Sequence, residues 1–110
     1  MEIITIKENR DFRRLYRKKI SYISPALVVY FKENGAGFSR LGITVGKKVG
    51  KAVKRNRAKR VIRQAYRDLL PLFSRNVDMV IVARKKSAEI KSFEAREELE
   101  KLLKKAKIID

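Results

Sequence analysis

The part of the sequence that most restricts the fold is an acid-free stretch from residue 34 to residue 67. It contains eleven Lys and Arg and no Asp or Glu. Apolar residues recur at helical spacing between Ala52 and Leu69, which predicts one long helix there. Four basic residues stack along one face of that helix: Arg55, Lys59, Arg63 and Arg67. The apolar face of this helix must pack on a core, while the basic face must stay in solvent or meet a polyanion.

This basic face is costly for an isolated helix. Like charges four residues apart cost about 0.2 to 0.5 kcal/mol per pair, and no acidic residue is interleaved to offset that cost. A solubilising surface is the simpler explanation, but phosphate groups would neutralise the charges and account for the pattern better. The chain as a whole carries a formal net charge of +17, and a polyanionic partner would relieve the resulting self-repulsion.

The composition limits the chemistry. The chain has 110 residues, of which 45% are hydrophobic, so we expect a single folded domain over residues 1–110. It contains neither Cys nor His, which excludes thiolate nucleophiles, imidazole acid/base catalysis and the usual zinc sites. The twelve acidic residues form no cluster suited to two-metal phosphodiester cleavage. A protein-only nuclease is therefore disfavoured, and we expect no catalytic residue.

Two further helices and several strands are expected around this segment. Asn9 can cap a helix running to about Lys18, on which Phe12, Leu15, Tyr16 and Lys19 share a face. Ser92 can cap a final helix whose charged side we expect to be a solvated face that binds no polyanion.

Strands are expected at 26–32, 40–45 and 77–83, with a short additional one at 21–24. Asn34-Gly35-Ala36-Gly37 favours a hairpin that would pair the first two of these strands antiparallel. The third strand, VDMVIVA, is apolar enough to be buried on both faces.

A basic helix alone could enter a DNA groove, lie on an anionic membrane or bind folded RNA. No helix-turn-helix pattern precedes the helix, since two strands do, and its apolar face lacks the Trp of membrane-surface helices. The sequence has no apolar run of about 18 residues and no secretory start. We expect a cytoplasmic protein with no membrane partner.

The residues from Arg40 to Arg67, RLGITVGKKVGKAVKRNRAKRVIRQAYR, resemble the signature of the bacterial ribonuclease P protein subunit. The hallmark of that family is an Arg-Asn-Arg motif in a basic helix, here Arg55-Asn56-Arg57. The similarity extends to Asn9-Arg10-Asp11-Phe12 and Tyr16, to the strand ending in Tyr30, and to Val80-Ile81-Val82-Ala83-Arg84. It therefore covers nearly the whole chain.

The resemblance implies an α+β fold, an α/β sandwich of order α-β-β-(β)-α-β-α, with a mainly antiparallel sheet and a left-handed β-α-β crossover. It also implies an accessory subunit of an endoribonuclease in which the RNA subunit performs catalysis with Mg²⁺. The reaction removes the 5′ leader of precursor tRNA, and Mg²⁺ would be bound mainly by the RNA and the substrate. The expected partners are one catalytic RNA and the precursor tRNA.

The resemblance assigns two binding surfaces. Contacts with the catalytic RNA are expected from Lys47, Lys48, Lys51, Lys54, Arg55, Asn56, Arg57, Arg60 and Arg63. Contacts with the single-stranded 5′ leader are expected from Phe12, Tyr16, Val28, Tyr30, Lys59 and Arg63. Periodicity alone would place Phe12 and Tyr16 in the core. The main alternative is a ribosome- or tRNA-associated protein of similar fold, which would share the basic helix but need no leader cleft.

Overall fold

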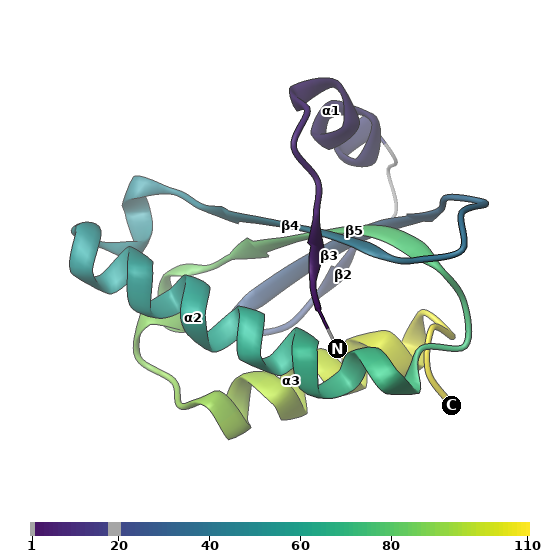
Figure 1. Ribbon diagram of the computed structural model, residues 1–110. Helices are drawn as coiled ribbons and strands as arrows, with labels where there is room; N and C mark the ends of the chain where they lie inside the picture. The colour runs from purple at the N-terminus through teal and green to yellow at the C-terminus, as the bar shows by residue number, and fades with distance from the viewer. Residues whose placement is uncertain (1, 18–20) are drawn as a thin grey trace.

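The computed structural model describes residues 2–17 and 21–110 (Figure 1). Three helices and one sheet of five strands form the described fold. The helices are α1 (Asn9–Arg17), α2 (Ala52–Leu69) and α3 (Ser92–Lys105). The strands are β1 (Ile4–Thr5), β2 (Tyr22–Ile23), β3 (Leu27–Glu33), β4 (Arg40–Val45) and β5 (Val77–Ala83). Short 3₁₀ helices are η1 (Lys47–Val49), η2 (Leu70–Leu72) and η3 (Lys85–Ala88). The α+β fold class is confirmed.

The strand order is β1-β4-β5-β3-β2, which corrects the expected hairpin. Strands β3 and β4 do not pair with each other, because β5 lies between them. β5 pairs antiparallel with β3 and parallel with β4, and β1 adds a further parallel pairing to β4. The sheet is therefore mixed and not mainly antiparallel. The continuous apolar sequence of β5 suits this central position, since both of its faces are covered.

Strands β4 and β5 are neighbours that run in the same direction, and α2 connects them across one face of the sheet (Figure 1). The connection has the left-handed sense that the resemblance implied, against the usual handedness of such crossovers. This crossover places the basic helix α2 against the face of the sheet opposite α1, and the N-terminus of α2 lies beyond the end of β4 (Figure 1).

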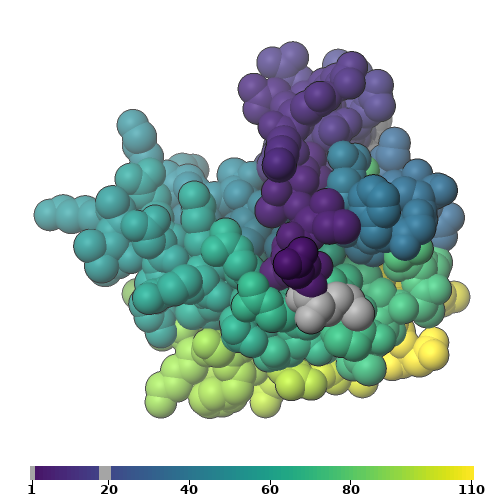
Figure 2. All heavy atoms as spheres, in the orientation of Figure 1, coloured from purple at the N-terminus to yellow at the C-terminus, as the bar shows by residue number. Residues whose placement is uncertain are grey.

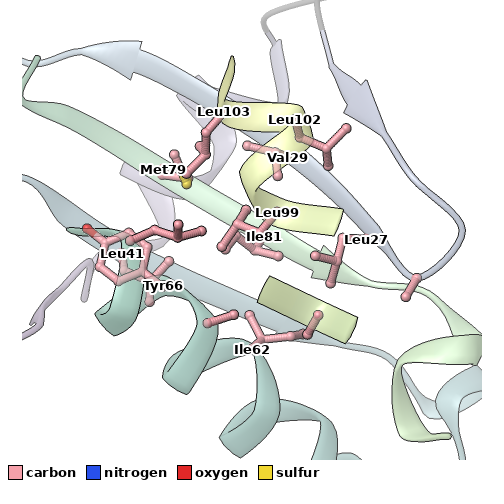
Figure 3. Close-up of a cluster of buried hydrophobic side chains, with 14 of the residues drawn as sticks. Leu27, Val29, Leu41, Ile62, Tyr66, Met79, Ile81, Leu99, Leu102 and Leu103 are labelled. Carbon is pink, nitrogen blue, oxygen red and sulfur yellow. The ribbon is translucent and has the colours of Figure 1, made fainter. Parts of the chain in front are cut away.

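Helices α2 and α3 cover one face of the sheet and enclose the main core (Figure 3). Strand residues Leu27, Val29 and Ile81 meet Ile62 of α2 and Leu99 of α3 there. All five are at most 1% exposed. The buried residues of α2 recur at the helical spacing that the sequence indicated, and they are Ala58, Val61, Ile62, Ala65, Tyr66 and Leu69.

Among the described helices, α1 is the one that covers the opposite face of the sheet, and it stands above that face in Figure 1. Leu15 of α1, Ile6 and Val80 of β5 form a small second core, with Phe12 and Tyr30 packed against it. Much of this face is left open.

Several local details differ from the sequence predictions. Strand β1 was not anticipated, because a two-residue strand gives no usable alternation. Asn9 is the first residue of α1 and not its cap. The N-cap residue of α3 is Lys91 and not Ser92, which is the first residue of that helix. The Glu94 carboxylate accepts a hydrogen bond from the Lys91 backbone N–H at 3.2 Å. The face position predicted for Lys19 lies outside the described residues.

Candidate nucleic-acid interface

The long helix α2 presents its basic residues along the side that faces away from the core. Lys59, Arg63 and Arg67 are exposed, whereas Arg55 is half-buried. The Nε of Arg55 is buried and has no hydrogen-bond partner among the described residues. The apolar residues of α2 fix this orientation by packing on the sheet and α3. The helix therefore keeps at least three of these four basic residues in solvent.

Most of the other residues predicted to contact the catalytic RNA gather at the N-terminal end of α2. Those that are exposed there are Lys47, Lys48, Lys51, Lys54, Asn56 and Arg60. Gly50 makes the tight connection between η1 and α2 with a φ of 143°, a conformation that L side chains rarely adopt. The turn sets the lysines of η1 next to the first turn of α2. One continuous basic surface results.

Arg57 has a structural bond that the sequence did not indicate. Its Nη1 donates a hydrogen bond to the backbone carbonyl of Ala88 in η3 at 2.6 Å, and its side chain is half-buried. Arg57 therefore ties α2 to the segment that follows β5, in addition to any contact with RNA.

Aromatic side chains line the open face of the sheet beside α1. The rings of Tyr16 and Tyr30 meet edge to face, with centroids 5.3 Å apart and an interplanar angle of 87°. The Tyr16 hydroxyl shares a hydrogen bond of 2.7 Å with Thr44 Oγ1 in β4. Tyr16 is still 40% exposed, so part of its ring can stack on another molecule. Thr44 is a residue of this site that sequence reasoning missed.

Phe12 lies over the backbone of β4. A Cβ atom at Gly42 would come within 2.6 Å of the Phe12 ring, so glycine is needed for this close approach. A hollow of about 180 Å³ opens beside the ring. It is also lined by Lys59 and Arg63 of α2.

The predicted leader residues therefore divide into two adjoining groups. Phe12, Lys59 and Arg63 share the hollow, while Tyr16 and Tyr30 contact each other. Val28 lies on the same face of β3 as Tyr30, half-buried and paired with Val82. Figure 2 shows the α1 region rising above the rest of the surface, with a recess between it and the η1–α2 end.

An ion pair fixes the base of this open face. Arg40 Nε and Nη2 donate to the two carboxylate oxygens of Asp78 at 2.8 and 2.5 Å, and Asn34 Nδ2 donates at 2.9 Å. Burial by itself would raise the pKa of Asp78, but these hydrogen bonds outweigh burial and hold the pKa below its ordinary value. Arg40 Nη1 also lies 3.6 Å from Asp11 of α1. The network links β4, β5, the β3–β4 loop and α1.

Over residues 2–17 and 21–110, no three Asp or Glu side chains lie close enough together to hold a metal ion. The same part of the chain includes no helix that is long and apolar enough to cross a membrane. The described residues thus form a basic surface at the η1–α2 end and an aromatic surface on the open face of the sheet. The guanidinium groups among them suit phosphate.

Comparisons with known proteins agree on one family. A family model described as Ribonuclease P matches residues 3–107. A ribonuclease P protein component of Natranaerobius thermophilus is 37% identical over 108 residues, covering 98% of this chain and 94% of that protein. One from Clostridium botulinum is 41% identical over 104 residues, covering 94% of each.

Solved structures give the same result. The ribonuclease P protein of Staphylococcus aureus superimposes with a TM-score of 0.85 at 34% identity, covering 99% of this chain and 100% of that one. The protein of Thermotoga maritima gives a TM-score of 0.81 at 35% identity, covering 92% and 96%. Fold and sequence are therefore similar over almost the full length of the chain.

Proposed function

Because the chain belongs to the ribonuclease P protein family, and so to the machinery of tRNA 5′ processing, we propose that it binds a catalytic RNA and the 5′ leader of precursor tRNA. In this proposal the chain is a single RNA-binding domain of the cytoplasm. It acts as the accessory subunit of an endoribonuclease, assembled as one protein with one RNA.

The observation that carries the proposal is the presence of two different surfaces on the two sides of β4. The η1–α2 end is basic and exposed, which suits the phosphate backbone of a folded RNA. The open face carries the Tyr16–Tyr30 pair and the Phe12 hollow. Unpaired bases stack on aromatic rings with little sequence preference, at about 1 to 3 kcal/mol per base.

Lys59 and Arg63 connect the two surfaces. Both belong to the basic face of α2, yet both line the hollow beside Phe12. A strand of RNA leaving the catalytic RNA could pass over these two residues and enter the open face. Their charges would hold its phosphates while Phe12, Tyr16 and Tyr30 hold its bases.

The chain itself supplies binding and orientation in this scheme. It has no His or Cys for proton transfer or nucleophilic attack. We assign hydrolysis to the catalytic RNA, with Mg²⁺ bound mainly by that RNA and by the substrate. Protein lysines and arginines would lower the Mg²⁺ concentration needed for assembly, because they neutralise some of the same phosphates.

The test is reconstitution with the ribonuclease P RNA encoded by the same genome. Cleavage of precursor tRNA is measured at a Mg²⁺ concentration too low for the RNA alone. The proposal predicts that the protein restores cleavage at the 5′ end of the mature tRNA. Binding of the RNA without restored cleavage would instead favour a ribosome- or tRNA-associated protein of the same fold.

A further inference from the structure

The ends of β4 and β5 carry two 3₁₀ helices that lie against each other. The two strands are parallel neighbours, so both finish at the same edge of the sheet. β4 leads into η1 and β5 leads into η3, and the two 3₁₀ helices pack together. Each presents two consecutive exposed lysines. They are Lys47 and Lys48 in η1, and Lys85 and Lys86 in η3.

η3 is fixed in place at several points. Ser87 in its centre is fully buried, and its backbone N–H donates to the Arg84 carbonyl at 2.9 Å. Arg84 Nη1 in turn donates to the Ser24 carbonyl at 2.8 Å. From the other side, Arg57 donates to the Ala88 carbonyl at 2.6 Å. The backbone that carries Lys85 and Lys86 is therefore held by both β2–β3 and α2.

The four lysines are not neutralised within the described part of the chain. No ion pair within 4.0 Å joins any of them to a carboxylate there. Glu89 follows η3 and is exposed, but it too has no such ion pair. Four unpaired cations on two packed helices make a compact surface that attracts phosphate.

We infer that Lys47, Lys48, Lys85 and Lys86 form one phosphate-binding surface, which we call the lysine ridge, and that it binds the catalytic RNA. Its partner is the catalytic RNA because the ridge adjoins the N-terminal end of α2 and lies at the end of the sheet, away from α1 (Figure 1). Arg57 is a positioning residue for this ridge, since its guanidinium holds η3 against α2. The inference rests on the proposed function and extends its RNA surface to η3, whose Ala88 lies 31 residues beyond Arg57 in the chain.

The first test replaces both η3 lysines, Lys85→Ala and Lys86→Ala, and measures affinity for the catalytic RNA at several salt concentrations. If each lysine contacts one phosphate, affinity falls about tenfold near physiological salt. The slope of log K against log salt then becomes shallower by about 1.4 to 1.8, at about 0.7 to 0.9 per contact. The matched control is Lys101→Ala with Lys105→Ala, two exposed lysines in the C-terminal half of α3, which should leave both quantities unchanged.

The second test asks how Arg57 acts. Arg57→Ala is made alone and in the Lys85→Ala/Lys86→Ala background, and thermal unfolding of each variant is recorded to show that it is folded. A positioning role predicts that Arg57→Ala weakens binding clearly in the native background and much less in the double variant. An equal loss in both backgrounds would show that Arg57 contacts the RNA independently, and the positioning role would be wrong.

Failure of the inference is distinguishable from failure of the proposed function. If the native chain neither binds the RNA nor restores cleavage, the proposed function is wrong. If the native chain does both, and the η3 double variant keeps the native affinity and salt slope, then only the lysine ridge is refuted.

Discussion

The two faces of the sheet are built differently. The face toward α2 and α3 is apolar and closed, with Leu27, Ile62, Ile81 and Leu99 at most 1% exposed. The face toward α1 has three buried residues in its core and mixes aromatic rings with charged groups. The closed face accounts for stability, whereas we propose that the open face recognises single-stranded RNA.

The difference follows from the sequence of the central strand. Val77, Met79 and Ile81 of β5 point to the closed face, while Asp78 and Val80 point to the open one. A charged residue in a central strand requires a partner, and Arg40 supplies it. The open face therefore keeps α1 in place partly by polar contacts, which leaves room for a ligand beside it.

The largest effect on this comparison is expected from Leu99→Ala on the closed face. Leu99 is fully buried, so the substitution leaves a cavity and should lower the free energy of unfolding by about 3 kcal/mol. Chemical denaturation measures this loss. Precursor tRNA binding by the folded fraction should be unchanged. A loss below about 1 kcal/mol would mean that the closed face does not dominate stability.

Asp78→Asn should cost about 2 kcal/mol of stability, because Arg40 loses its closest carboxylate partner and keeps only the longer contact with Asp11. The pKa of Asp78 is lowered in the folded state, so its contribution is complete above the unfolded value near 4 and is lost as the pH falls through the lower folded value. Urea denaturation across acidic pH should therefore show a weaker acid dependence in the variant. An identical acid dependence in the native chain and the variant would show that the ion pair does not contribute to the pH dependence of stability.

Tyr66→Phe should stabilise the closed face by about 1 kcal/mol. The Tyr66 hydroxyl is buried and has no hydrogen-bond partner among the described residues, so removing it removes an unsatisfied group. Burial also raises the pKa of this phenol. The native chain should lose stability as the pH rises above the ordinary tyrosine value near 10, and the variant should lose less. Lower stability of the variant at neutral pH would show that the hydroxyl has a bound partner.

The smallest effect is expected from Thr44→Val on the open face. The substitution removes the 2.7 Å hydrogen bond to Tyr16 and should cost about 0.5 kcal/mol of stability. Freed from this bond, the Tyr16 ring should hold a leader base less well, and the preference for precursor over mature tRNA should fall about twofold. Tyr16→Phe is the matched variant, since it removes the same bond from the other side. Opposite effects of the two substitutions would contradict the positioning role of Thr44.

Much of the fold was predictable, and the misses have physical causes. Helical spacing located α2 because its buried residues recur along one face. The predicted pairing of β3 with β4 in a hairpin was wrong. Asn34-Gly35-Ala36-Gly37 favours a turn whether the two flanking strands pair directly or, as here, are separated by β5. The continuous apolar sequence of β5 was the one signal that could have placed it at the centre.

The candidate site was predictable where charge or aromatic character showed it. The exposed lysines follow from residue type and position. Tyr16 and Tyr30 were expected in the site from the family resemblance, because periodicity alone would place Tyr16 in the core. The bond from Arg57 to Ala88 was not predictable, because its acceptor is a backbone carbonyl that any residue would provide. Thr44 was missed because a hydroxyl in a strand has no distinguishing pattern.

The most direct test of the account compares one variant from each surface in the reconstituted holoenzyme. Arg60→Ala lies on the exposed side of α2, and Tyr30→Ala lies on the open face. Two affinities are measured for each variant: protein for catalytic RNA, and holoenzyme for precursor against mature tRNA. The account predicts that Arg60→Ala weakens the first and spares the precursor preference, while Tyr30→Ala does the reverse. Equal loss of both affinities in both variants would contradict two separate surfaces.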